Sequence, residues 1–507
     1  MLTAGGCVLL VHPDGSTSFS FENETCLPEV RSTAETGAGI YLPTNVCKPP
    51  LLSDTPLTRL GVGKYKTHLC FQCFCVIAKG TRAKQRIDCP GLSFCSSECL
   101  EGGSACLDLC SAYLFALAPA QGLKPQAQAQ APSPSPQPDV SSGVMMADLQ
   151  QLALLACCNA ILGPGNQIMQ SLHLTLGSAY YGELEPAGDV LAAADDILAF
   201  AQSPQGRGKL RRFLVDGLGR GKLARLLAAL KYNAQVLPVL QLPGTSVLCF
   251  LPTLSKLNHS CAPNSVLVRE DFGPGSALPF TVRLHMTESP FRAIDRDREL
   301  TISYLANLCC SRRDRQALLQ AAFHFRCRCG RCEAEKEEEE GGDDQGGELG
   351  AWLSAAMSER DWRADTIAAA LEAVRARVLS DGGSPSASLV YAAHPLLMVY
   401  LQQSMRLRDN RLVGRCTMAL VRLLEMGGGV SGQPGVVELL ARGAEALWSH
   451  LQQSRGAGAS EEELAGGRDL AQRALRYLCD WHGRDATAAA LHAHVSSLSS
   501  RLDSYIP

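Results

Sequence analysis

Hydrophobic and polar residues follow distinct patterns along the 507-residue chain. Residues 1–60 and 245–305 carry short apolar runs separated by glycine, proline and polar residues, which is typical of β-strands and turns. From Val144 to about Leu237 apolar residues recur every three or four positions, as in Leu149–Leu162 and Leu218–Leu230, and this spacing predicts helices. The patterns therefore predict two strand-rich stretches with a helical stretch between them.

Two segments interrupt these patterns. The tract Pro119–Gly143 consists largely of Gln, Ala, Pro and Ser without apolar periodicity, and it predicts a disordered linker over 111–143. The acidic segment Glu333–Glu348 predicts a solvated hinge over 334–349. Beyond it, amphipathic stretches such as Asp409–Met426 and Val436–Gln453 alternate with glycine-rich loops, which indicates stacked helical hairpins over 350–507.

Length and charge limit what the protein can be. A chain of 507 residues exceeds one hydrophobic core, so roughly two to four domains are expected. The net charge of −3 provides no basic footprint, so we expect no direct nucleic-acid binding. The chain has no apolar run of about eighteen residues and no basic leader, so we expect neither a membrane span nor a signal peptide. A monomer in the cytoplasm, the nucleus or both is expected.

Cysteine has the most uneven distribution of any residue type. The chain has 22 cysteines, and eight of them lie within residues 70–110. The spacings Cys70-x2-Cys73, Cys95-x3-Cys99 and Cys106-x3-Cys110 supply thiolates in pairs, which suits the four ligands of tetrahedral zinc. The alternative is a set of buried, unreactive thiols, but paired spacing argues against it. In an intracellular chain such bunching indicates metal more than disulfides.

Three motifs follow one another in the second half of the chain. They are Leu-Asn-His-Ser-Cys-Ala-Pro-Asn over 257–264, Glu-Leu-Thr-Ile-Ser-Tyr over 299–304, and Phe-Arg-Cys-Arg-Cys-Gly-Arg-Cys over 325–332. In this order and spacing they resemble the SET-domain protein lysine methyltransferases. Together with the cysteine-rich segment 68–110, they resemble the SET and MYND domain-containing (SMYD) family over nearly the whole chain.

The resemblance implies an α+β fold. A SET-domain β-fold would be split by a MYND-type zinc finger, and a post-SET zinc site and an all-α, tetratricopeptide-like C-terminal domain would follow. The implied parts are the N-terminal part of the SET domain (1–67), the finger (68–110), the linker (111–143), a helical insertion (144–240), the core SET domain (241–306), the post-SET segment (307–333), the acidic hinge (334–349) and the helical domain (350–507).

The resemblance also implies three zinc sites, each with its own ligands. The first would be held by Cys70, Cys73, Cys95 and Cys99. The second would be held by Cys89, Cys106 and Cys110, with Cys75 as the nearest thiol to replace a family cysteine that is missing near Arg86. The third would be held by Cys327, Cys329 and Cys332, with Cys261 from the Asn-His-Ser-Cys motif as the fourth ligand.

The implied reaction places modest demands on the protein. A lysine amine must be neutral to attack a methyl group, yet with a pKa of about 10.4 only about one in a thousand is neutral at pH 7. Burial in an apolar channel lowers that pKa, and alignment of the reacting atoms supplies much of the rate. The resemblance makes Tyr304 the catalytic residue whose hydroxyl orients the amine; the alternative for Tyr304 is a half-buried aromatic at a strand end.

The resemblance also assigns the site of the cofactor, S-adenosyl-L-methionine. Its contacts would come from Gly37, Gly39, Asn258, His259, Tyr304 and Phe325, where the glycines permit close backbone approach and Phe325 packs on the adenine. Phe323 lies where relatives often have a second tyrosine. Asn233 is either a further polar position of the family or a simple helix-end cap.

The sequence therefore predicts a zinc-containing enzyme that uses S-adenosyl-L-methionine to methylate a lysine on a protein substrate, histone or non-histone. The alternative is a catalytically weak or silent scaffold whose zinc finger binds proline-rich partner peptides.

Overall fold

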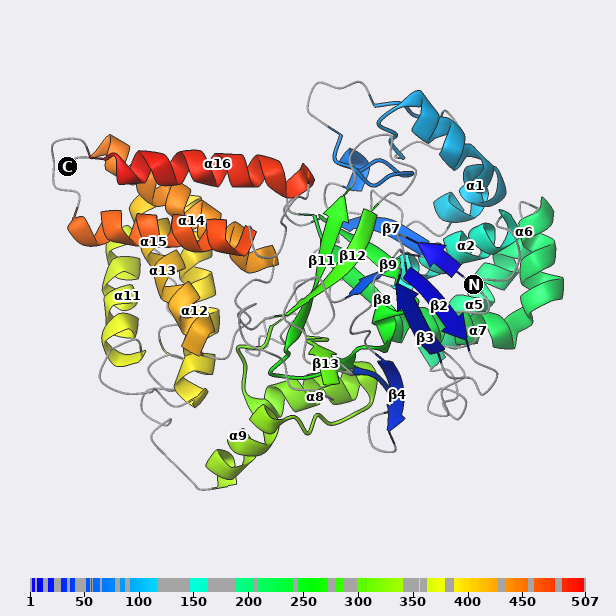
Figure 1. Cartoon of the computed structure of the whole chain (residues 1–507), viewed down its shortest axis with the longest axis horizontal. Coiled ribbons are helices and arrows are strands. Elements are labelled where there is room, and N and C mark those ends of the chain that lie inside the picture. Colours follow the sequence, from blue (N-terminus) through cyan, green and yellow to red (C-terminus); the bar gives the residue numbers. More distant parts are fainter. Residues whose placement is uncertain are drawn as a thin grey trace, which may run out of the picture. The chain divides into compact units, whose positions relative to one another are not determined.

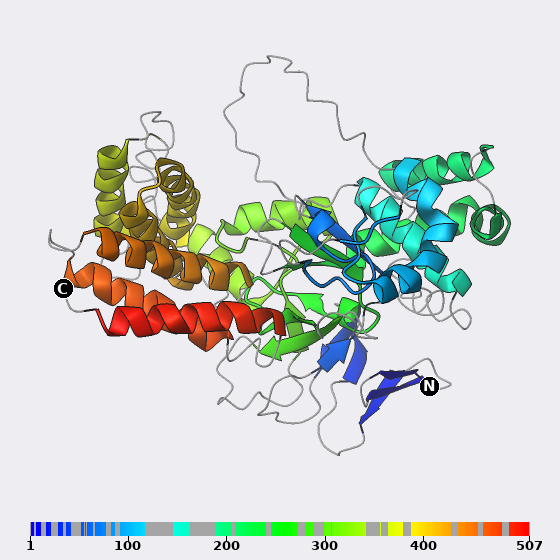
Figure 2. The same cartoon turned by 90° about the horizontal axis from the view of Figure 1, so that it is seen from above.

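The structure is a computed structural model of the whole chain, drawn in Figures 1 and 2. It describes residues 2–4, 7–11, 17–21, 29–33, 37–41, 52–54, 56, 58–63, 66–77, 83–86, 92–116, 146–162, 188–204, 208–239, 245–271, 280–286, 299–305, 307–340, 355, 363–378, 387–426, 434–454, 460–478 and 486–505.

The chain divides into two compact units. Unit 1 comprises Met1–Asn258 and Leu267–Leu300, and unit 2 comprises His259–Val266 and Thr301–Pro507. The divisions fall within three strands, β10 (Asn258–His259), β11 (Ser265–Asp271) and β13 (Glu299–Ile302). Each unit is described by itself below.

The described strands form four small sheets, with strand orders β1-β2-β3, β10-β13-β5-β4, β11-β12-β6 and β7-β9-β8. The strands not yet given are β1 (Leu2–Ala4), β2 (Cys7–Val11), β3 (Thr17–Phe21), β4 (Glu29–Thr33), β5 (Gly37–Tyr41), β6 (Leu52–Asp54), β7 (Thr58–Gly63), β8 (Ala234–Pro238), β9 (Thr245–Phe250) and β12 (Phe280–Met286). In the last sheet β9 pairs antiparallel with both neighbours, and its residues Val247–Phe250 are buried. The short strands agree with the brief apolar runs of the sequence.

The helices of unit 1 gather around one buried helix. They are α1 (Ser97–Ala116), α2 (Met146–Leu162), α5 (Gly188–Gln202), α6 (Gly208–Arg212) and α7 (Gly219–Asn233), with a π-helical segment at Phe213–Leu218 and one-turn helices at Lys66–His68 and Leu254–Lys256. Every residue of α2 from Leu149 to Cys158 is buried, because α1, α5, α7 and β7 all pack on it. The Thr58 hydroxyl of β7 also donates to the Leu152 carbonyl at 3.3 Å. A helix that is buried on every side over this stretch needs such an enclosure.

Unit 2 consists mainly of helices that pack in the order of the chain. They are α8 (Arg312–Phe323), α9 (Gly330–Glu340), α11 (Ala364–Val378), α12 (Ala387–Leu407), α13 (Asn410–Met426), α14 (Pro434–Gln453), α15 (Glu461–Tyr477) and α16 (Ala486–Asp503). From α11 onward each helix packs on the next, and Figure 2 shows α16 (red) at one edge of this array. The helices approach closely where glycine lies between them: a Cβ on Gly414 of α13 would lie 2.2 Å from Leu447 Cγ of α14.

The stacked helices predicted over 350–507 are therefore present, and the described chain is mostly helical with small sheets. Two predicted boundaries need correction. Helix α1 continues to Ala116, so residues 111–116 of the predicted linker are helical, while 117–143 lie outside the described residues. Helix α9 continues to Glu340, since glutamate is a good helix former, so the predicted hinge begins as helix. Among the described residues, no helix has the length and apolar character that a membrane crossing requires.

Candidate metal centres and the adjoining aromatic site

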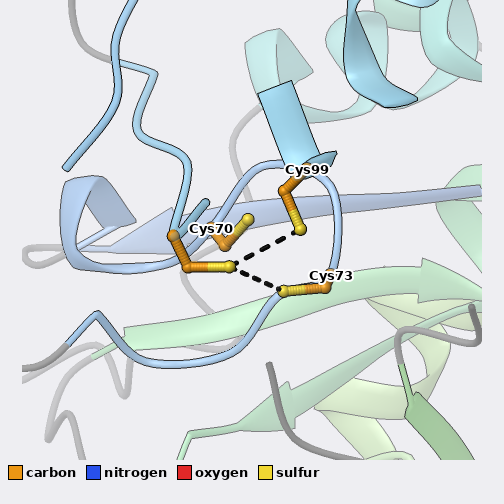
Figure 3. A group of neighbouring side chains, drawn as sticks. Cys70, Cys73 and Cys99 are labelled. Carbon is orange, nitrogen blue, oxygen red and sulfur yellow. Dashed lines mark hydrogen bonds between the residues drawn. The ribbon is translucent and has the colours of Figure 1, made fainter. Parts of the chain in front are cut away.

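The first cysteine cluster draws on two segments of unit 1. Cys70 and Cys73 lie on a tight turn in which the Phe74 N–H donates to the Cys70 carbonyl at 2.9 Å, and Cys99 lies in the first turn of α1, shortly after Cys95. The four sulfurs lie within 4.8 Å of one another, and Figure 3 shows the labelled side chains of Cys70, Cys73 and Cys99 converging. Sulfurs around tetrahedral zinc lie about 3.8 Å apart, since each Zn–S bond is about 2.3 Å. The Sγ distances Cys73–Cys95 and Cys95–Cys99 are both 3.5 Å, so the cluster could hold zinc with little rearrangement.

Cys75 also belongs to the surroundings of this first cluster. Its Sγ lies 3.2 Å from Cys73 Sγ. The sequence predicts Cys75 as a ligand together with Cys106 and Cys110, but the turn that carries Cys70 and Cys73 places Cys75 beside those two residues: the Cys70 N–H donates to the Cys75 carbonyl at 3.0 Å. Cys89, the other residue predicted for the second site, lies outside the described residues.

The thiols of the first cluster are hydrogen-bonded to one another, and these contacts shift the pKa values of Cys70 and Cys75 in opposite directions. Hydrogen bonds from the thiols of Cys73 and Cys75 lower the pKa of Cys70 well below its ordinary value, and the same contacts raise the pKa of Cys75. One thiolate is thus already favoured within the cluster. Metal binding would displace the remaining protons, because zinc binds deprotonated sulfur. Arg59 lies within electrostatic range of this cluster and of Cys106; burial lowers its pKa to about 10, against the attraction of the cysteines.

The second cluster consists of Cys106, Cys110 and Cys158, whose sulfurs lie within 4.8 Å of one another. The first two lie one turn apart on α1, and their Sγ atoms are 4.0 Å apart. Cys158 comes from α2 and is fully buried. Cys158 is absent from the ligands that the sequence predicts, because it lies outside the finger-like segment and its neighbours are ordinary apolar helix residues.

The third cluster lies in unit 2 and contains the four cysteines that the sequence grouped. Cys261, Cys327, Cys329 and Cys332 have their sulfurs within 4.8 Å of one another, with Cys332 Sγ 3.6 Å from Cys261 Sγ. The Gln316 side chain of α8 fixes the cysteine loop: its amide donates to the Cys327 carbonyl at 2.6 Å and accepts from the Cys327 N–H at 2.9 Å. Hydrogen bonds from the other thiols, that of Cys261 first, lower the pKa of Cys329 far below its usual range.

A buried ionic network, which no sequence motif predicts, adjoins the third cluster. The guanidinium of Arg315, fully buried, donates to Glu335 at 2.6 Å and lies 4.0 Å from Cys332 Sγ. Arg331 donates to the same carboxylate at 2.8 Å and to the Cys261 carbonyl at 2.9 Å. The Tyr391 hydroxyl of α12 donates to Glu335 at 2.6 Å. Burial raises the pKa of Glu335, but the hydrogen bonds from Tyr391, Arg315 and Arg331 outweigh it and lower the pKa overall.

The rings of Tyr304, Phe323 and Phe325 pack beside the third cluster in the same apolar cluster of unit 2, and the His259 ring lies against Tyr304 and Phe325. The ring of Tyr304 lies 5.4 Å from His259, 5.0 Å from Phe323 and 6.3 Å from Phe325, measured between ring centres. All four side chains are half-buried. The structure thus brings together His259, Tyr304 and Phe325, three of the residues predicted for the cofactor site, and adds Phe323.

His259 connects the aromatic rings to the cysteines. The backbone N–H of Tyr304 donates to His259 Nδ1 at 3.0 Å, and His259 Nε2 lies 3.3 Å from Cys261 Sγ. Because Nδ1 accepts, a neutral ring carries its proton on Nε2 and directs it at the Cys261 sulfur. Burial lowers the pKa of His259 to about 4, which keeps the ring neutral near pH 7. Such outer contacts orient the ligands of many metal sites.

The remaining predicted site residues lie in unit 1. The Asn258 amide donates to Glu299 Oε1 at 2.6 Å, which joins β10 to β13. Gly37 and Gly39 lie on β5, which pairs with β4 and, through Ile40 and Tyr41, with β13. Asn233 ends α7 and donates to the Ala229 carbonyl at 2.9 Å, so its amide serves its own helix.

Comparison with protein-family models gives no match for this chain, and comparison with curated proteins gives no significant match. By geometry alone, three cysteine clusters among the described residues could hold metal ions, and the third adjoins a half-buried aromatic site in unit 2.

Proposed function

We propose that the protein is a zinc-containing methyltransferase of the SET and MYND type that transfers a methyl group to a lysine side chain of a protein substrate. The observation that carries this proposal is the packing of His259, Phe323 and Phe325 around Tyr304, directly beside the cysteines of the third cluster. The proposal also rests on the sequence motifs that surround these residues.

The aromatic residues suit the handling of a lysine amine. Rings of Tyr304 and Phe323 provide apolar surface, and burial against such surface favours the neutral amine that the reaction needs. Rings also attract the cationic form before it loses its proton, through their electron-rich faces. The Tyr304 hydroxyl then orients the nitrogen. When bound, S-adenosyl-L-methionine supplies an electrophilic methyl group, so the protein need not provide a nucleophile of its own.

His259 acts here as a positioning residue. Its ring has one nitrogen on the Tyr304 backbone and the other beside Cys261, so it fixes the strand end from which the Tyr304 hydroxyl projects. A misplacement of about 1 Å can reduce a rate about 100-fold, so a rigid link of this kind has catalytic value. The role of zinc in this proposal is structural, because the third cluster offers four sulfurs and leaves no open position for a substrate.

The test is a calorimetric titration of S-adenosyl-L-methionine into the zinc-saturated full chain, with N258A and E299A in parallel. We expect binding by the wild type and a loss of at least tenfold in N258A, about 1.4 kcal/mol, the cost of one lost hydrogen bond to the ligand. E299A is the matched control, because it removes the same Asn258–Glu299 hydrogen bond and leaves Asn258 in place.

The titration has three possible results, and each leads to a different conclusion about the cofactor site. Binding that is lost in N258A and retained in E299A supports direct contact between Asn258 and the cofactor. An equal loss in both variants assigns Asn258 to strand pairing and removes it from the cofactor site. No binding by folded wild-type protein contradicts the enzyme proposal and leaves a zinc-bearing scaffold for proline-rich peptides as the better account.

A further inference from the structure

The cysteines of α1 and α2 form a group that the finger-like spacing of the sequence does not contain. Cys106 and Cys110 are four residues apart on α1, so they lie on the same face of that helix, one turn apart. That face packs against α2, where Cys158 is fully buried. The three sulfurs lie within 4.8 Å of one another, and those of Cys106 and Cys110 are 4.0 Å apart.

From this geometry we infer that Cys106, Cys110 and Cys158 provide three of the four ligands of one zinc ion that fastens helix α1 to helix α2. The inference is independent of methyl transfer. It replaces Cys75 in the predicted ligand set with Cys158 of α2. Helix α2 begins at Met146, thirty residues after α1 ends at Ala116.

The chemistry of the three donors favours a thiophilic metal. Thiolates select zinc over the hard cations magnesium and calcium, which prefer oxygen ligands. The spacing of 4.0 Å between Cys106 and Cys110 sulfurs is close to the value of about 3.8 Å expected between two ligands of one zinc ion. It is about twice the S–S bond length of roughly 2.05 Å, so this pair is not arranged as a disulfide.

The position of the site gives it a structural consequence. Helix α2 is the buried centre of unit 1, in contact with α5, α7 and β7, whereas α1 carries Cys99 of the first cluster in its first turn. A metal ion between α1 and α2 therefore ties the cysteine-rich segment to the core of the unit. The segment between the two helices, residues 117–145, need not supply that connection.

The alternative is that Cys158 is a small apolar residue of the core, as free cysteines often are. Its neighbour Cys157 provides a matched control, since it is equally buried, lies on the same helix and belongs to no cysteine cluster among the described residues. The experiment measures the zinc content of the purified full chain by mass spectrometry for the wild type, C158S and C157S. We expect about three zinc ions per wild-type chain, from the three clusters, a loss of about one in C158S and none in C157S.

A second measurement needs no variant and covers the case in which C158S fails to fold. The native wild-type chain is alkylated with and without a chelator, and the labelled cysteines are mapped. We expect Cys158 to become reactive together with Cys106 and Cys110 when zinc is removed, while Cys157 stays protected until the chain unfolds. The inference is overturned if C158S keeps the wild-type zinc content, if Cys158 follows Cys157 in its reactivity, or if Cys158 is recovered in a disulfide.

Discussion

Removal of the Glu335 charge should destabilise unit 2 strongly. The Glu335 carboxylate accepts hydrogen bonds from Arg315 at 2.6 Å, from Arg331 at 2.8 Å and from the Tyr391 hydroxyl at 2.6 Å. The side chain of Arg315 is 0% exposed and that of Glu335 is 11% exposed. The substitution E335Q keeps the shape of the side chain and removes its charge, so that Arg315 remains buried without a carboxylate partner.

The size of the effect follows from this burial. Breaking a buried ion pair by removing one partner costs about 3–5 kcal/mol, because the other charge stays in a poorly solvated place. Breaking an exposed pair costs about 0–1 kcal/mol. Glu438 and Arg442 on α14 are a matched control in the same unit, with a distance of 2.7 Å and side chains that are 27% and 45% exposed. We therefore expect E335Q to lose several times more stability than E438Q.

The sequence provides a selective probe of this unit. All four tryptophans, Trp352, Trp362, Trp448 and Trp481, lie beyond residue 350, so tryptophan emission reports on unit 2 during urea unfolding. With an m-value of roughly 1–3 kcal/mol/M, a loss of about 4 kcal/mol lowers the urea midpoint on the order of 2 M. A midpoint for E335Q that falls no further than that of E438Q would refute the reasoning, since the network would then be screened like a surface pair.

Two further predictions concern the proposed reaction and the response to acid. Y304F keeps the ring that packs 5.0 Å from Phe323 but removes the hydroxyl, so methyl transfer from labelled S-adenosyl-L-methionine to a peptide array should fall about 100-fold while cofactor affinity changes little; an unchanged rate would contradict the role of Tyr304. For Glu463, burial raises the pKa, but the hydrogen bond from Arg411 and that from the Ser460 N–H outweigh it and lower the pKa overall. Its contribution to stability is therefore present above the unfolded-state value of about 4.3 and is lost as the pH falls through the lower folded value. The stability gap between wild type and E463Q should narrow as the pH falls below about 4.3, and a gap in tryptophan-monitored unfolding that does not change with pH in this acidic range would count against this ion pair.

The sequence predicted those features that local spacing determines. The stacked helices of 350–507 follow from apolar residues on one helix face. Cys70 with Cys73 and Cys95 with Cys99 stand as close pairs in the sequence, and the structure joins these two pairs in one cluster. The grouping of Cys261 with the cysteines of 327–332 came from the family resemblance, because 66 positions of chain separate Cys261 from Cys327 and no local pattern spans them.

The features that the sequence did not predict depend on contacts between distant helices. Cys158 stands in an apolar helix with Cys157 beside it, and only the packing of α2 on α1 determines which of the two faces Cys106. Arg315 and Glu335 look like ordinary surface charges in sequence, since each lies among other charged residues. Their burial follows from the packing of α8, α9 and the loop of the third cluster, which excludes water from both side chains.

Within unit 2, the third cluster contacts both the ionic network and the aromatic site. A zinc ion bound to these four thiolates would carry a net charge of −2, and the buried guanidinium of Arg315, 4.0 Å from Cys332 Sγ, would offset part of that charge. Glu335 in turn holds Arg315 in place and connects it, through the Tyr391 hydroxyl, to helix α12. The His259 ring lies between Cys261 and the backbone of Tyr304 and contacts both. The position of the Tyr304 backbone thus depends on the geometry of the cysteines, and this links the proposed catalytic residue to a cluster that could hold a metal ion.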